Sequence, residues 1–291
     1  MTRRAPDAGW LARAPSGGLV VAAIASVQVG GALAVHLFSW VSPSGAVSLR
    51  MLFAALVVLA ISPPRLGGRA LRRLPLAAAF GLVLAGMTLS FYGALHRIPL
   101  GIAVSLEFVG PLAVAVAGSR RPVDLVWVAL AGGGILALTH GGGHISGLGV
   151  ALAVLAGGLW GAYILLSARV GRAFERGAGL TLALCVASVA TLPVGVATAG
   201  SDLLQPRVLA LGAVIGILSS AIPYSLELEA LRRIAPPVFG VLMSLEPAMA
   251  ALAGLVILGQ SLSARAVLGI GLVVAASVGA SLRGRRVPRD I

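Results

Sequence analysis

Ten apolar runs dominate this sequence, and a short charged or Pro/Gly-rich break separates each run from the next. They cover residues 19–40, 44–62, 75–95, 100–118, 125–139, 147–168, 180–199, 208–230, 238–258 and 266–282. Most are close to the about 20 residues that a helix needs to cross about 30 Å of hydrocarbon. Only 11% of the 291 residues are charged, against about 25% in an ordinary soluble domain. The sequence therefore predicts an all-α, polytopic membrane protein of ten transmembrane helices without an extramembrane domain.

The basic residues lie mostly in the breaks and indicate how the chain is oriented. All 22 are arginines, and the formal net charge is +13. With ten crossings, 18 of them fall on the side of the two termini, whereas Arg97, Arg207 and Arg265 fall on the other side. Positive charge accumulates in cytoplasmic loops, so both termini are expected in the cytoplasm, with residues 283–291 as a basic tail. The charge is expected to face lipid headgroups rather than nucleic acid.

The chain also contains a short internal repeat. Residues 94–98 (ALHRI) are similar to residues 230–234 (ALRRI), and the Ser-Leu-Glu of residues 105–107 recurs at residues 244–246. These matches predict two halves, residues 1–140 with helices one to five and residues 147–282 with helices six to ten. Five spans per half is an odd number, so the second half would enter the membrane from the opposite face. Such five-plus-five inverted repeats are a recurrent construction of secondary transporters, and duplication without transport is the alternative.

Three ionisable residues lie deep inside the predicted spans. Glu107, Glu246 and Arg50 are each about 9–12 Å from a membrane face at about 1.5 Å per residue. An ionisable group in hydrocarbon is a functional candidate by default. Arg50 and Glu107 share a depth and could pair, whereas the counterpart of the second span offers Glu246 no arginine. We therefore expect Glu246 to couple protons, assisted by Glu107, and Arg50 to hold Glu107 or a substrate carboxylate. The alternative is structural hydrogen bonding beside Pro111 and Pro247.

Uncharged polar and aromatic residues inside the spans complete the candidate substrate site. Together with Arg50, the candidates are Gln28, Tyr92, Ser105, Trp160, Tyr163 and Tyr224. Trp160 and Tyr163 are three residues apart and share one helical face. Gly30 and Gly31 would let another backbone approach the first span. Packing between helices would explain these residues equally well. Glu227 and Glu229, late in the eighth span, are expected to form interfacial ion pairs with the arginines that follow.

Two long segments carry a resemblance to a known family. They are residues 99–131 (PLGIAVSLEFVGPLAVAVAGSRRPVDLVWVALA) and residues 219–259, which include SSAIPYSLELEALRRI and FGVLMSLEPAMAALAGLVILG. These segments, with nearly the whole chain, resemble the drug/metabolite transporter superfamily, within it the EamA-domain proteins, and among these the bacterial threonine/homoserine exporters. The resemblance implies two EamA-like repeats around a central cavity. It also implies secondary active export of small amino acids by proton antiport with alternating access.

Carried over by position, the resemblance places the family's mid-helix acids on Glu107 and Glu246, its polar first-helix position on Gln28 and its second-helix arginine on Arg50. The expected partners are a small amino acid, protons and the lipid bilayer, in the inner (plasma) membrane of a bacterium. The sequence departs from the family at Gln260, where a Gly-Glu pair is usual after the ninth helix. An acidic coupling group in that loop is therefore not expected.

Other functional classes are less consistent with the sequence. A broad-specificity drug or metabolite exporter of the same superfamily should have a more apolar cavity, whereas Arg50 and two deep glutamates favour an amphoteric ligand. A channel or a non-transporting membrane scaffold is a further alternative, although no filter loop or charged ring is visible. The four histidines fall at outer ends or outer loops, so a Ser–His dyad at mid-membrane is not expected. We expect neither an enzyme nor a cofactor or metal site.

Overall fold

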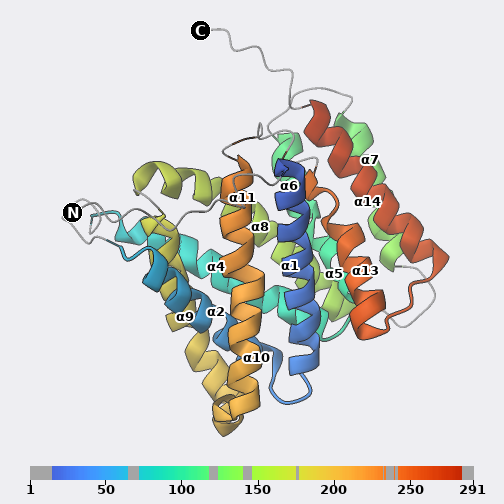
Figure 1. Cartoon of the computed structure of the whole chain (residues 1–291). Coiled ribbons are helices and arrows are strands. Elements are labelled where there is room, and N and C mark those ends of the chain that lie inside the picture. The colour runs from blue at the N-terminus through green and yellow to red at the C-terminus, as the bar shows by residue number, and fades with distance from the viewer. Residues whose placement is uncertain are drawn as a thin grey trace, which may run out of the picture.

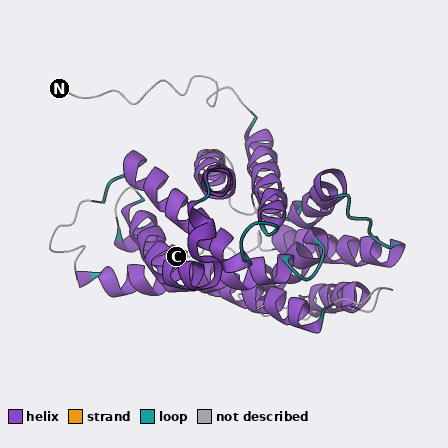
Figure 2. Cartoon of the chain, turned by 90° about the horizontal axis from the view of Figure 1, so that it is seen from below, coloured by secondary structure: helices purple, strands orange, loops and turns teal. Residues whose placement is uncertain are grey.

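The structure of the chain is a computed structural model, and it is helical throughout its described part. It describes residues 15–64, 72–117, 124–139, 146–174, 177–231, 233, 239 and 242–283, apart from the side chains of residues 115–116, 124–125, 139, 168, 224–225, 228–229, 231 and 280–283. The α-helices are α1 (Ser16–Leu37), α2 (Pro43–Ile61), α4 (Leu74–Leu95), α5 (Leu100–Glu107), α6 (Val109–Ala117), α7 (Asp124–Thr139), α8 (Gly147–Ala173), α9 (Ala178–Ala199), α10 (Pro206–Gly216), α11 (Ile222–Leu231), α13 (Glu246–Leu258) and α14 (Ala264–Arg283). A 3₁₀-helix, η2 (Gly200–Leu204), and a π-helix, η3 (Ile217–Ala221), join them. Figure 2 shows no strand among the described residues.

Half of the apolar helical segments in the described part of the chain are long enough to cross a membrane. Five described segments of at least 18 residues could each cross a bilayer, namely 16–37, 43–61, 74–95, 147–173 and 178–204. Five shorter apolar helices cover residues 100–114, 126–138, 206–221, 246–258 and 264–279. Each of the ten predicted runs therefore contains a helix. The chain is an all-helical, multi-pass membrane protein, as the sequence predicted.

Prolines interrupt three of the predicted helices. The fourth run is divided into α5 and α6 at Phe108, because Pro111 has no N–H for the carbonyl of Glu107, four residues earlier. The eighth run is divided into α10, η3 and α11, with Pro223 at the start of α11. In the ninth run, α13 begins at Glu246 with Pro247 in its first turn, a position that tolerates proline.

The helices pack closely where glycine replaces a side chain. A Cβ added at Gly101 on α5 would lie 2.8 Å from the Cα of Ala251 on α13. A Cβ added at Gly134 on α7 would lie 2.8 Å from the carbonyl oxygen of Gly269 on α14, and one added at Gly269 would lie 2.8 Å from the carbonyl oxygen of Gly134. Figure 1 shows α7 and α14 side by side at one edge of the bundle. Small residues allow this approach between apolar helices.

Helices from the two halves of the sequence contact one another throughout the bundle. α2 packs against α9, α5 against α13 and α7 against α14. α1 packs against α11 and α13, whereas α8 packs against α4, α5 and α6. α1 lies centrally, near α10, α11 and α13 (Figure 1). The polar residues of both halves therefore meet inside one bundle.

Candidate functional site

The candidate site is built around the π-helix η3, whose backbone carbonyls accept hydrogen bonds from side chains of neighbouring helices. The N–H of Ile222 donates to the carbonyl of Ile217, five residues earlier, and Pro223 offers no N–H to the preceding turn. The carbonyl of Leu218 instead accepts from Ser26 Oγ on α1 at 2.7 Å, and that of Ser219 accepts from Arg50 Nη2 on α2 at 3.3 Å. Side chains from two other helices thus replace the missing helical hydrogen bonds.

Arg50 connects η3 to the aromatic side chain of Tyr92 on α4. Its Nη1 donates to the Tyr92 hydroxyl at 3.3 Å, and its Cζ lies 5.4 Å from the centre of the tyrosine ring. Tyr92 is fully buried, with the ring of Phe38 packed edge-on at 5.9 Å. The contacts of the guanidinium thus include a cation–π contact and long hydrogen bonds to two neutral acceptors. The structure brings together Arg50 and Tyr92, both of which the sequence proposed for the substrate site.

Three carboxyl groups on different helices are linked to one another in series, and the first of them, Glu107, interacts electrostatically with this guanidinium. Glu107 ends α5 and Glu246 begins α13, and their exposed fractions are 8% and 6%. Arg50 lies within electrostatic range of Glu107, and Glu246 lies within electrostatic range of both Glu107 and Glu227 on α11. We call Arg50, Glu107, Glu227 and Glu246 the carboxyl–arginine cluster. Both glutamates proposed for proton coupling belong to it.

Glu227 is the member that sequence reasoning missed. We expected it at the membrane interface with the arginines that follow α11, and its place next to Glu246 was not foreseen. The available signal was its position four residues after Pro223, because intramembrane acids and broken helices gather at transporter sites. The side chains of Glu229 and Tyr224, also on α11, lie outside the described part of the structure.

The remaining polar candidates occupy different surroundings. Gln28 is 3% exposed on α1, on the helix that packs against η3, α11 and α13. A Cβ added at Gly30 would lie 2.2 Å from Ser219 Oγ and 3.3 Å from the Ser219 amide nitrogen, so the close backbone approach predicted there is confirmed. Ser105 is fully buried on α5, and its hydroxyl donates to the carbonyl of Gly101 in the same helix at 2.6 Å.

Two buried hydroxyls on η3 have no hydrogen-bond partner among the described residues. They belong to Ser219 and Ser220, which are 4% and 1% exposed. Buried polar atoms in native proteins are usually paired. Their position beside Arg50 adds two polar groups to the site that sequence reasoning did not single out.

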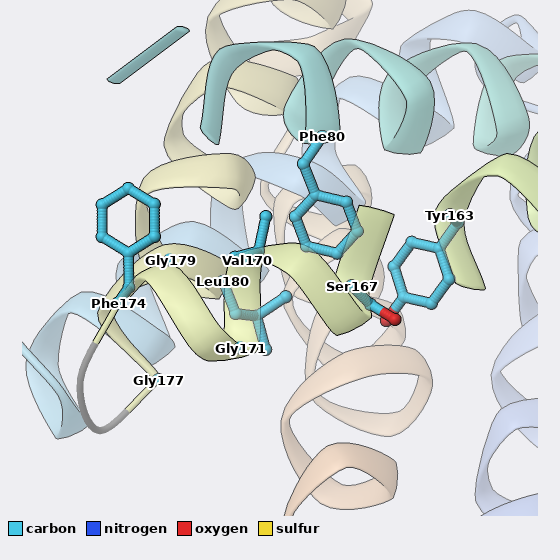
Figure 3. Close-up of a pocket in the computed structure, with 9 residues that line it drawn as sticks. All are labelled: Phe80, Tyr163, Ser167, Val170, Gly171, Phe174, Gly177, Gly179 and Leu180. Carbon is cyan, nitrogen blue, oxygen red and sulfur yellow. The ribbon is translucent and has the colours of Figure 1, made fainter. Parts of the chain in front are cut away.

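The structure separates the two aromatic candidates on α8. Trp160 packs edge-on against Phe108, with ring centres 5.3 Å apart, and so lies beside the break that follows Glu107. Tyr163 stacks on Phe80 of α4, with ring centres 4.9 Å apart, and lines a separate pocket (Figure 3). No residue of the carboxyl–arginine cluster lines that pocket. The shared helical face therefore does not place both rings at one site.

A bundle of apolar helices that encloses several acids and an arginine beside broken helices has the architecture of a secondary membrane transporter. The model of the EamA-like transporter family matches residues 147–282. The threonine/homoserine exporter RhtA of Salmonella typhimurium strain LT2 is 42% identical over 276 residues, which are 93% of this chain and 92% of that protein. The chain belongs to the EamA-like transporter family.

Further comparisons agree with this assignment. The threonine/homoserine exporter RhtA of Escherichia coli K12 is 42% identical over 273 residues, 92% of each chain. A solved protein structure that is 18% identical superposes with a TM-score of 0.62 and covers 92% of this chain and 98% of its own. That likeness establishes the fold alone, whereas the exporters establish the family.

Proposed function

We propose that this chain exports small amino acids of the threonine/homoserine type from a bacterium in exchange for protons, by alternating access. The observation that carries the proposal is the carboxyl–arginine cluster, which combines a cation for a carboxylate with several acids that can carry protons. Relatives that are 42% identical over 92–93% of this chain are threonine/homoserine exporters. A largely apolar drug site would not require such a cluster.

Arg50 binds the carboxylate of the amino acid in this proposal. Its hydrogen bonds to Tyr92 and to the Ser219 carbonyl are both 3.3 Å long and end on neutral acceptors. A carboxylate forms shorter, charge-assisted hydrogen bonds with a guanidinium and can therefore compete for the same donors. Gln28, on the helix α1 that packs against η3, and the Ser219 and Ser220 hydroxyls supply further polar groups in this proposal.

Glu246 carries the proton, with Glu107 and Glu227 assisting. Intramembrane acids in chains are the usual proton carriers of transporters. Glu246 interacts electrostatically with both other glutamates, so a change in protonation at one site alters the field at the others. Loading of an amino acid at Arg50 would change the charge beside Glu107. This link couples the substrate to the proton.

Two five-helix halves, residues 1–140 and 147–282, rock against each other to open the site to each side in turn. The helix contacts support this arrangement. If each helix is exchanged for its counterpart in the other half, the α1–α11 pair becomes the α8–α4 pair, and the α2–α9, α5–α13 and α7–α14 pairs become themselves. The helices of every one of these pairs are in contact. The reciprocal contact of Gly134 and Gly269 is also typical of a twofold axis. Because most arginines lie in loops on the side of the two termini, and positive charge accumulates on the cytoplasmic side, this arrangement is oriented with both termini in the cytoplasm.

Counterflow in proteoliposomes tests the function directly. Vesicles loaded with unlabelled threonine should accumulate labelled threonine or homoserine, and an imposed proton gradient should drive net transport. A panel of other amino acids and of apolar cationic drugs would define the range of substrates. Accumulation of the drugs without any amino acid would support a broad-specificity exporter and overturn the proposed substrate class.

The Glu246→Gln variant tests the coupling. It should keep threonine counterflow but lose the response to the proton gradient, because an amide cannot carry a proton. The matched control is Asp202→Asn on η2, at a carboxylate whose Oδ1 accepts from Gln205 Nε2 at 2.7 Å. That control should retain both activities. Undiminished proton-driven transport by Glu246→Gln would exclude the assigned role.

A further inference from the structure

A pocket outside the carboxyl–arginine cluster lies between α4, α8 and α9. It has a volume of about 250 Å³. Its lining residues are Phe80, Tyr163, Ser167, Val170, Gly171, Phe174, Gly177, Gly179 and Leu180. Figure 3 shows the ring of Phe174 at one end and the rings of Phe80 and Tyr163 at the other, with aliphatic side chains between them. The lining is mostly apolar, with hydroxyls only on Tyr163 and Ser167.

Positive charge accompanies this apolar pocket. The described residues from 72 to 80 and from 163 to 180 include four exposed arginines, Arg72, Arg73, Arg169 and Arg172. Arg73 Nη1 donates to the carbonyl of Ala173, next to the lining residue Phe174. A guanidinium is therefore fixed at the edge of the pocket, and its other N–H groups suit a phosphate.

We propose that this pocket binds an anionic phospholipid, with part of an acyl chain among the aromatic rings and the phosphate at Arg73. Basic pockets between transmembrane helices are suited to anionic lipid headgroups. The pocket is smaller than the about 300–1,000 Å³ that enclose a drug-sized molecule, so it suits one segment of a ligand whose remainder lies in the bilayer. Because α4 belongs to the first half of the chain and α8 and α9 to the second, the bound lipid contacts both halves.

Gly171 allows a direct test of the apolar part. A Cβ added there has no heavy atom within 4 Å, so Gly171→Leu places a side chain in the pocket without a backbone clash. The matched control is Gly158→Leu on the same helix, where an added Cβ also meets nothing within 4 Å and which does not line the pocket. Native mass spectrometry of purified protein titrated with phosphatidylglycerol measures the affinity of the bound lipid. Gly171→Leu should weaken binding about tenfold, because a few buried methylene groups contribute that much, and Gly158→Leu should not.

Arg73→Gln tests the headgroup. It should weaken phosphatidylglycerol binding about fivefold, since one arginine near a membrane surface contributes about that factor, and should leave phosphatidylethanolamine binding unchanged. The matched control is Arg97→Gln, because Arg97 Nη1 also donates to a helix carbonyl, that of Gly93, at 2.7 Å. Glycerol phosphate without acyl chains should not bind.

Three results would overturn the proposal. The first is unchanged phosphatidylglycerol affinity in folded Gly171→Leu protein. The second is an equal loss in the Gly158→Leu or Arg97→Gln control. The third is loss of threonine counterflow in Gly171→Leu with lipid binding intact, which would assign the pocket to the substrate. The proposal does not rest on the proposed function, because lipid binding is measured without transport.

Discussion

Replacing Gly157 by alanine should loosen the contact between α8 and the acidic end of α5. An added Cβ would lie 2.5 Å from the carbonyl oxygen of Glu107, 3.2 Å from its carbonyl carbon and 3.3 Å from its Cα. All three atoms are backbone, so no rotamer change can relieve the contact. A carbon–oxygen contact is normally about 3.3 Å or longer. The two helices must therefore separate locally by about 0.8 Å.

The neighbouring residue makes the energy of this change measurable. An added Cβ at Gly158 meets nothing within 4 Å, so Gly158→Ala changes the helix propensity alone, by about 1 kcal/mol in favour of alanine. Gly157→Ala has the same propensity gain and adds overpacking, which costs about 1–3 kcal/mol. The difference in unfolding free energy between the two variants should then be about 1–3 kcal/mol.

Thermal unfolding in one detergent measures this difference. An unfolding entropy of about 2.1 cal/mol/K per residue gives about 0.6 kcal/mol/K for this chain. Gly157→Ala should therefore unfold roughly 2–5 °C below Gly158→Ala. It should also exchange threonine more slowly, because the shift moves Glu107. Equal melting temperatures for the two variants would refute the close α5–α8 contact.

Further predictions concern hydrogen bonds between helices and the orientation of the chain. Ser48 Oγ donates to the Thr191 carbonyl on α9 at 2.7 Å, so Ser48→Ala should lower stability by about 1 kcal/mol and the melting temperature by about 2 °C. Ser105→Ala should change the melting temperature by under about 1 °C, because the Ser105 hydroxyl bonds within its own helix. A loss of threonine-binding free energy larger than the loss of unfolding free energy would confirm Ser105 in the substrate site. Gln260 Oε1 accepts from the Leu100 N–H at 3.1 Å, so Gln260→Ala should lower stability by about 0.5–2 kcal/mol, whereas Gln260→Glu keeps an acceptor and should melt within about 1 °C of the natural protein. Green fluorescent protein fused to either terminus should fluoresce in bacterial cells if both termini are cytoplasmic, and a dark fusion at one end would contradict the inverted arrangement.

Sequence reasoning was most successful for single residues whose chemistry conflicts with the surrounding hydrocarbon. Glu107 and Glu246 stood out because hydrocarbon is a poor environment for a carboxyl group, and both are buried in the structure. Reasoning from helical periodicity was less successful. Trp160 and Tyr163 share a face of α8 yet contact different neighbours, because Trp160 packs against Phe108 between α5 and α6 whereas Tyr163 packs against Phe80 on α4. Glu227 was assigned to the membrane interface because arginines follow it closely in the sequence. Its electrostatic neighbour on another helix, Glu246 of α13, could not be identified from that spacing.

The sequence by itself determined that the chain is a multi-pass helical membrane protein, because a lipid solvent requires long apolar helices that satisfy their own backbone hydrogen bonds. It also determined the family and two of the interior acids, Glu107 and Glu246. Only the tertiary structure decided which groups meet, such as Arg50 with Tyr92 and the Ser219 carbonyl, or Glu246 with Glu227. The physical reason is that lipid and protein interior are similarly apolar, so the sequence pattern of a membrane helix does not reveal which face turns inward. That choice depends on where small residues such as Gly30, Gly134 and Gly157 allow helices to touch.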